Sequence, residues 1–151
     1  MKYILIISII CLASCKAQKE TKMNAGHTSD FELVASDAYS GIDSYEAAVI
    51  SNAKSLNKFY SRINKTRKPG LPVPVVDFSK DVLVVMCLGE QKGETTPKLA
   101  KSDHEDGIVI TVALSEPNDS NIKENPIISY PFYIYKLPTT SKAISIQKQG
   151  F

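Results

Sequence analysis

An uninterrupted apolar run in the middle of the chain places the strongest limit on the fold. Residues 81–88 read DVLVVMCL, and after the Asp no polar residue alternates with the apolar ones. In a strand, successive side chains face opposite sides of the sheet, so both faces of this segment would be apolar. Such a strand must be covered on both faces, and we expect it in the interior of a sheet. A buried helix is the alternative, but the β-branched valines, the short length and the polar flanks favour a strand.

The start of the chain has the layout of a secretory signal peptide. Lys2 supplies a positive charge, residues 3–10 are apolar apart from Ser8, and small residues precede Cys15. The segment LASC at residues 12–15 resembles the bacterial lipobox, in which the cysteine becomes the lipidated first residue of the mature protein. An ordinary signal peptide or a membrane helix is the alternative, but the apolar run is short for a membrane span. We expect a signal peptide at 1–14, lipidated Cys15 with a flexible tether at 15–30, and a single β-rich domain at 31–151.

Lipidation of Cys15 would place the protein in the cell envelope. One acyl chain binds a bilayer only marginally, at roughly 0.8 kcal/mol per buried methylene, and two or three chains anchor stably. Residue 16 is Lys, whereas Asp at this position is the familiar signal for retention in the inner membrane. We therefore expect an anchor in the outer membrane, and the sequence leaves open which face carries the domain.

Composition narrows the classes of function. The formal net charge is +2, and cleavage of the signal removes only Lys2, so the mature chain has no strong field to attract nucleic acid. Of the three cysteines, only Cys87 remains available in the folded part, so we expect no disulfide framework. A single Cys among Val, Met and Leu is typical of a small buried hydrophobic residue. We expect no cofactor and no metal.

The other segments predict a mainly β, α+β fold. An N-cap at Ser51-Asn52 and an apolar stripe at helical spacing predict one helix over about residues 52–64. An Asp-Gly pair at 106–107 predicts a hairpin turn, and Pro131 predicts a bulge or an edge position. The expected strands are 31–35, 45–50, 81–88, 98–101, 108–114, 127–137 and 143–147. About seven strands with hairpin spacing predict an antiparallel β-sandwich or half-open barrel, with the helix over one end or edge.

Residues that could carry chemistry are few. The densest set of possible metal ligands is Asp103, His104, Glu105 and Asp106. One His without Cys is a poor zinc set, and a hairpin tip, which explains these residues without a metal, is favoured. No G-x-S-x-G, H-E-x-x-H or P-loop pattern is present in the sequence. We therefore expect a protein that is not an enzyme.

Two further patterns have both a functional and a structural interpretation. A basic cluster could contact anionic lipid or a partner, although a solvated helix face is favoured: Lys58, Arg62, Lys65, Arg67 and Lys68. An aromatic row could form a platform for glycan or peptide, although core and cross-strand packing is favoured: Tyr130, Phe132, Tyr133 and Tyr135.

Four short motifs resemble those of the PrcB-like family, whose domain is named after a lipoprotein associated with a surface protease complex. The motifs are VDFSKD at 76–81 with the apolar strand and Gly89, YSGI at 39–42, YPFYI at 130–134 and KLP at 136–138. The resemblance covers roughly residues 31–146 and implies an accessory role for a protease, with no catalytic residues to carry over. One departure is the loop after Gly89, where members commonly carry Thr-Gly-Gly-Tyr and this chain reads EQKGETT.

These observations together predict a lipid-anchored, non-catalytic module that binds another envelope protein, with a protease complex as the implied partner. Loops on a rigid sandwich are the usual place for such a contact, so residues 115–126 and the loop after the central strand are the candidates. The latter consists of Gly89, Glu90, Gln91, Lys92, Gly93, Glu94, Thr95 and Thr96. The alternatives are a protease inhibitor that inserts sandwich loops into an active-site cleft, and a peptide- or glycan-binding module that uses the aromatic row.

Overall fold

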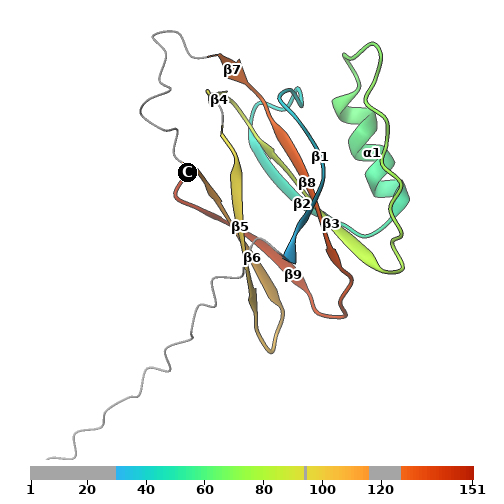
Figure 1. Ribbon diagram of the computed structural model, residues 1–151, viewed down its shortest axis with the longest axis vertical. Coiled ribbons are helices and arrows are strands. Elements are labelled where there is room, and N and C mark those ends of the chain that lie inside the picture. Colours follow the sequence, from blue (N-terminus) through green and yellow to red (C-terminus); the bar gives the residue numbers. More distant parts are fainter. Residues whose placement is uncertain (1–29, 94, 116–126) are drawn as a thin grey trace, which may run out of the picture.

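The computed structural model describes residues 30–93, 95–115 and 127–151, and these residues form nine strands and one helix (Figure 1). In chain order the elements are β1 (Glu32–Asp37), β2 (Tyr45–Ile50), α1 (Ala53–Ile63), β3 (Asp81–Leu88), β4 (Gln91–Lys92), β5 (Pro97–Asp103), β6 (Ile108–Leu114), β7 (Ile128–Ser129), β8 (Phe132–Pro138) and β9 (Ile144–Gln149). The described residues form no closed barrel. They make a mainly β sandwich with one covering helix, as the sequence predicts.

The apolar run forms β3, an interior strand of a four-stranded sheet with the order β1-β8-β3-β2. Both of its faces are covered, as its composition predicts. Val82, Val84 and Met86 pack into a core shared with a second sheet, whereas Leu83 and Val85 pack into a separate core under α1. The central sheet therefore lies between two other layers (Figure 1).

The second sheet has the order β5-β6-β9 and covers one face of the central sheet. The hairpin predicted at Asp106-Gly107 joins β5 to β6, which pair antiparallel. The last strand, β9, pairs parallel to β6, so this part of the expected antiparallel arrangement is wrong. The reason is topological, because β9 follows β8 of the other sheet and reaches β6 by crossing between the layers.

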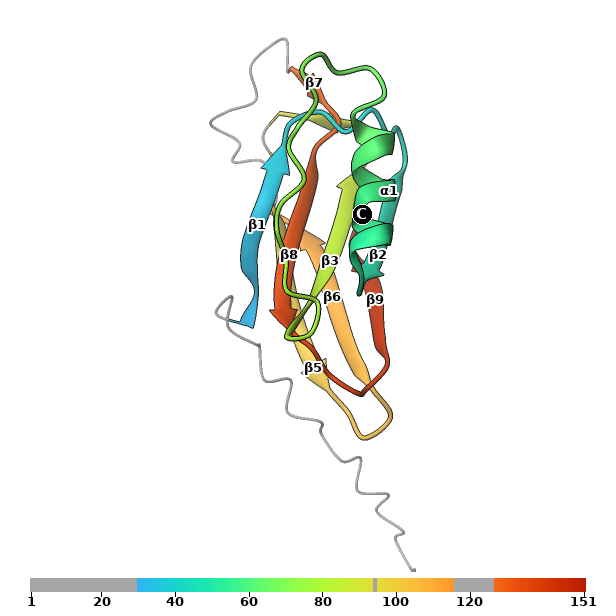
Figure 2. The ribbon, with the colours of Figure 1, turned by 90° about the vertical axis from the view of Figure 1, so that its right-hand side faces the viewer.

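The helix α1 begins and ends where its pattern predicts. Asn52 is the N-cap, with Oδ1 accepting a hydrogen bond from Ser55 N at 2.8 Å. Leu56, Tyr60 and Ile63 are its buried residues. The prediction that α1 covers an end or edge is wrong, because it packs across a face of the central sheet (Figure 2). That face is apolar along β3 and requires cover, and the segment that follows the helix completes it through Leu71, Val76 and Phe78.

The aromatic strand predicted at 127–137 is broken at Pro131 into β7 and β8. Of the two alternatives that Pro131 predicts, the irregularity is present and the edge position is not, because β8 lies between β1 and β3. Pro131 precedes β8, where its lack of an N–H costs no ladder bond, and its carbonyl accepts a hydrogen bond from Leu88 N at 2.9 Å.

Candidate functional site

The predicted partner-binding loop begins at Gly89, where the geometry admits only glycine. Its φ is +74°, and a Cβ built on it would lie 2.8 Å from the carbonyl oxygen of Asp43. The chain therefore turns sharply away from β3. Gln91 holds the turn, because its Nε2 donates a hydrogen bond to the carbonyl of Leu88 at 3.0 Å.

The loop is not open coil, because part of it pairs with a segment far along the chain. Gln91 and Lys92 form β4, which pairs with Ser129 and Ile128 of β7. Gly93 N donates to the carbonyl of Ile127 at 3.1 Å. This two-stranded ribbon carries the exposed apolar side chains of Ile127 and Ile128, with exposed fractions of 78% and 54%.

The second predicted loop starts beside the first. Ser115 Oγ donates a hydrogen bond to the carbonyl of Thr96 at 3.0 Å, and Ser115 N donates to the same oxygen at 3.0 Å. The carbonyl of buried Thr95 accepts a hydrogen bond from Tyr133 OH at 2.8 Å. The bases of the two loops are thus joined, whereas Glu94 and residues 116–126 lie outside the described part.

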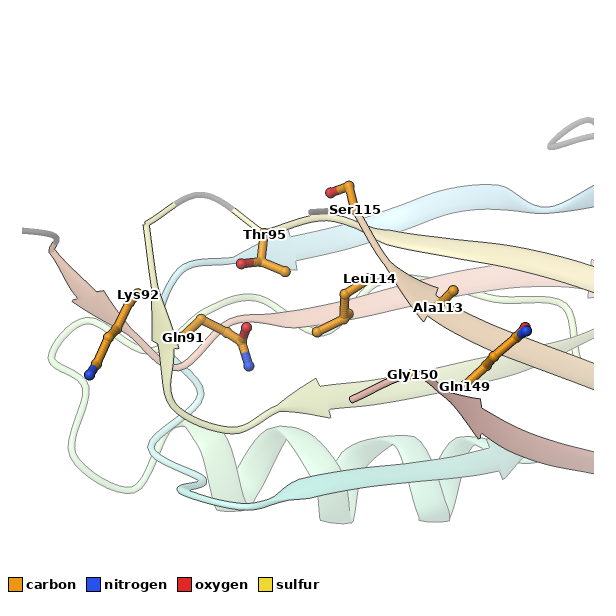
Figure 3. Close-up of a pocket in the computed structure, with 8 residues that line it drawn as sticks. All are labelled: Gln91, Lys92, Thr95, Ala113, Leu114, Ser115, Gln149 and Gly150. Atoms are coloured by element: carbon orange, nitrogen blue, oxygen red, sulfur yellow. The ribbon is translucent and has the colours of Figure 1, made fainter. Parts of the chain in front are cut away.

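An open hollow of about 460 Å³ lies between these segments (Figure 3). Gln91 and Leu114 extend toward one another across it, whereas Lys92 extends away from it (Figure 3). Its lining residues come from both loop bases and the end of β9: Gln91, Lys92, Thr95, Ala113, Leu114, Ser115, Gln149 and Gly150. We call the region formed by residues 89–93, 95, 96, 115 and 127–129 the ribbon end of the molecule.

An aromatic corner supports the ribbon end. The rings of Tyr39 and Tyr130 meet edge to face with centroids 5.9 Å apart, and Tyr130 OH donates to Glu90 Oε2 at 3.2 Å. Tyr130 N donates to the carbonyl of Ala38 at 2.9 Å, and Tyr130 O accepts from Ser40 N at 2.6 Å. Tyr130 therefore fixes the loop between β1 and β2 to the start of β8.

The predicted aromatic row does not form an exposed platform. Phe132 and Tyr135 are buried on opposite faces of the central sheet, with 1% and 8% of their surfaces exposed. Phe132 packs edge to face on Phe59, and Tyr133 stacks on Tyr135 with centroids 6.4 Å apart. Phe132 and Tyr135 therefore serve core packing, whereas Tyr130 and Tyr133 are half-buried. The peptide- or glycan-binding alternative stays a prediction.

The acidic cluster lies at the tip of the β5–β6 hairpin, at the opposite end from the ribbon (Figure 1). Asp103 forms an ion pair with Lys142, which holds the pKa of that carboxyl below its usual range. The Lys142 ammonium also donates to the carbonyl of His104 at 2.9 Å. In the described residues no three His, Cys, Asp or Glu side chains are grouped so that they could hold a metal ion.

Cys87 is buried in the core under α1, as expected of a small hydrophobic residue. Burial raises the pKa of its thiol to about 11. The thiol is therefore protonated at neutral pH, which is the opposite of what a nucleophilic cysteine requires.

The basic cluster divides in the structure. Arg62 forms a two-pronged ion pair with Glu46 at 2.6 Å, and Arg67 bonds to Asp37 and to the carbonyl of Tyr39. Lys58, Lys65 and Lys68 are exposed. Arg62 thus joins α1 to β2, and Arg67 joins the segment after α1 to the end of β1.

The assignment of the loop after Gly89 to partner binding stays a prediction. The pairing of this loop with β7 could not be predicted, because neither two-residue strand has a local pattern. The expected lipidation site, Cys15, lies outside the described residues. Among those that are described, no helix has the length and apolar character needed to cross a membrane. No family model, no curated protein and no solved structure matches the chain.

Proposed function

We propose that the chain is a lipid-anchored, non-catalytic accessory protein of the bacterial cell envelope whose ribbon end binds another protein. The single observation that carries this proposal is the exposure of Ile127 and Ile128 on a hydrogen-bonded ribbon at one end of the sandwich. The partner class, a protease complex, comes from the resemblance to the PrcB-like family.

The chemistry of the ribbon end suits protein recognition. Two adjacent apolar side chains that are exposed on the free chain would gain free energy when a partner covers them. Lys92 faces Ile128 across the ribbon and supplies a charge at the rim. Backbone pairing restrains the ribbon before contact, which lowers the entropy lost on binding.

An anchor at Cys15 would raise the concentration of this surface near other envelope proteins. The polar segment 15–30 is long enough in sequence to hold the domain away from the lipid. The anchor and the contact made by the ribbon end would act together, because a protein confined to the membrane meets membrane partners at a high effective concentration.

A non-catalytic role agrees with the state of the candidate reactive groups. The Cys87 thiol is buried with a raised pKa, and Asp103 is engaged by Lys142. The side chains that line the hollow carry amide, hydroxyl, ammonium and apolar groups, and the Glu90 carboxylate beside it accepts a hydrogen bond from Tyr130 OH. These groups suit recognition.

Deletion of the whole loop is a poor test, because Thr95 and Thr96 bond to the body of the sandwich. A photo-crosslinking amino acid at Ile128 of the full-length chain in its native envelope is sharper. Ser141 is the matched control, since it is exposed in the turn between β8 and β9 at the opposite end. We expect one main crosslinked protein from position 128, and we expect Lys92→Glu to lower the yield of that product. Equal products from positions 128 and 141, or none from 128, would contradict the proposal.

An assay of the purified chain distinguishes an accessory subunit from a protease inhibitor. An accessory role predicts that the purified full-length chain leaves the hydrolysis rates of papain-like and serine proteases unchanged. Inhibition that Ile128→Glu abolishes would instead assign the ribbon end to an inhibitor, and the accessory role would be wrong.

A further inference from the structure

The strand β2 lies at an edge of the central sheet and is the least protected edge of the two larger sheets, β1-β8-β3-β2 and β5-β6-β9. Its sequence, YEAAVI, contains no Pro and no Lys, and its pairing with β3 has an unbroken register. The other edges of these two sheets, β1, β5 and β9, carry features that discourage further pairing. The register of β1 shifts at Val34, β5 contains Pro97 and two lysines, and β9 contains Lys148.

The hydrogen bonds of β3 show which backbone groups of β2 face outward. Leu88 N donates to Pro131 O, and Thr139 N donates to Lys80 O, so even-numbered residues of β3 bond toward β8. Odd-numbered residues of β3 therefore bond toward β2, where they face Glu46, Ala48 and Ile50. The N–H and C=O groups of Tyr45, Ala47 and Val49 are directed to the open edge.

A groove runs between this edge and α1. It has a volume of about 340 Å³. Val85 and Cys87 of β3 form its floor, Ala48 of β2 is exposed on one wall, and Phe59 of α1 lies on the other. A strand added beside β2 would place every second side chain over this apolar groove.

Lysines flank the edge on both sides. Lys58 of α1 lines the groove, and Lys148 of β9 lies with its ammonium 5.2 Å from the centroid of the Tyr45 ring. Neither lysine forms an ion pair with a carboxylate of the described residues, whereas Arg62 and Glu46 satisfy one another. The environment of the edge is therefore net positive.

We propose that the β2 edge binds an extended acidic segment of a partner protein, which adds as a further strand between α1 and β9. Alternate apolar side chains of the segment face α1 beside Ala48 and Phe59, and the acidic ones face β9, where Lys148 lies. Lys58, on the α1 side, adds a positive charge that attracts the acidic segment as a whole. A second copy of this chain fits less well, because β2-to-β2 pairing would bring two Lys58 side chains together. This surface is separate from the ribbon end and stands without the function proposed for it.

The probe is a capped, fluorescein-labelled peptide, Glu-Val-Glu-Val-Glu-Val-Glu, titrated with the full-length chain in detergent and followed by anisotropy. We expect saturable binding, and binding at least about tenfold weaker for the peptide with Lys in place of each Glu, because like charges oppose docking. Equal binding of the two peptides, or no saturable binding of the acidic one, would overturn the proposal.

Three charge reversals locate the site. Lys148→Glu should weaken binding by about threefold or more, as expected for loss and reversal of an exposed ion pair. Lys58→Glu should weaken binding by about threefold, because it reverses a charge beside the edge. Lys65→Glu makes the same change just beyond α1, outside the groove, and should alter binding less than about twofold. An effect of Lys65→Glu equal to the other two would reduce the binding to general charge attraction and overturn the assignment.

Ala47→Pro tests the backbone pairing, because it removes an outward N–H without removing a bond to β3. We expect an unchanged circular dichroism spectrum and a loss of peptide binding of at least about tenfold, since a central ladder bond is lost. Unchanged binding by the folded variant would contradict strand addition. Sedimentation that shows a wild-type dimer converted to a monomer by Ala47→Pro would assign the edge to self-association and overturn the proposal.

Discussion

At the scale of single residues, Gly89 shows how one backbone conformation determines where the ribbon end begins. The sequence predicts that Gly89 ends the strand, and the structure adds the reason that no other residue fits. Its φ is positive, and the space for a Cβ is occupied by the backbone of Asp43 and Ser44. Gly93 also has a positive φ of +86°, but nothing lies within 4 Å of its would-be Cβ.

These two glycines form a matched pair for a stability test. Gly89→Ala should lower the free energy of unfolding by about 3 kcal/mol, because it adds a clash with the backbone of Asp43 to the strain of a positive φ. Gly93→Ala should cost only about 1 kcal/mol, since it adds the strain alone. Urea denaturation of both variants measures the difference, and a larger loss for Gly93→Ala would contradict the described turn.

The buried Cys87 thiol should make the free energy of unfolding fall as the pH rises into the alkaline range. Burial raises the pKa of its thiol from 9.0 to about 11, so the folded state disfavours the thiolate. The stabilisation is fully present below pH 9 and is lost as the pH rises toward 11, by about 2–3 kcal/mol in total.

The comparison of wild type with Cys87→Ala isolates this effect from the tyrosines that titrate in the same range. The free energy of unfolding of the wild type should fall more steeply between pH 9 and 11 than that of the variant. Parallel curves over this range would mean that the Cys87 thiolate is not disfavoured in the folded state.

At the scale of elements, the local sequence pattern was sufficient to predict the longer helix and strand segments. The double-faced apolar run predicts β3 as an interior strand, and the stripe ending at Ile63 predicts α1 within one residue of its observed bounds. Pairings that depend on distant residues could not be predicted. The β4–β7 ribbon joins Lys92 to Ile128, and the parallel pairing of β9 depends on a crossover between layers.

Two arginine–carboxylate ion pairs, of Arg67 and of Arg62, are expected to contribute differently to the free energy of unfolding. Arg67 and Asp37 are partly buried, with 19% and 30% of their side chains exposed, and Arg67 also bonds to the Tyr39 carbonyl. Arg67→Ala should lower the free energy of unfolding by about 1–3 kcal/mol, because it leaves a partly buried carboxylate without its partner. Arg67→Lys should restore only part of this loss, since an ammonium cannot form the forked contact.

Arg62→Ala is the control for Arg67→Ala. Its ion pair with Glu46 is more exposed, at 53% and 43%, so the loss should be below about 1 kcal/mol. Thermal or urea unfolding of the three variants gives the ranking. A cost of Arg62→Ala that equals or exceeds that of Arg67→Ala would show that burial does not set the strength of these ties.

At the scale of the whole molecule, the three layers leave two different surfaces for contact. The ribbon end presents exposed isoleucines beyond the sandwich. The β2 edge presents outward-facing backbone groups beside an apolar groove with Lys58 at its rim. The hairpin tip with Asp103 and the turn with Ser141 lie at the opposite end from the ribbon (Figure 1). A domain tethered through residues 15–30 could use both contact surfaces while it remains attached to a membrane.

The central claim is that an anchor at Cys15 and the ribbon end together hold a partner in the envelope. Its most direct test is affinity capture of the full-length protein from its native envelope after crosslinking, compared with a Cys15→Ala form that cannot carry acyl chains. We predict that an envelope protein, with a protease as the expected class, is recovered with the wild type and lost with Cys15→Ala. Recovery of the same proteins with both forms, or of no protein with the wild type, would contradict the account.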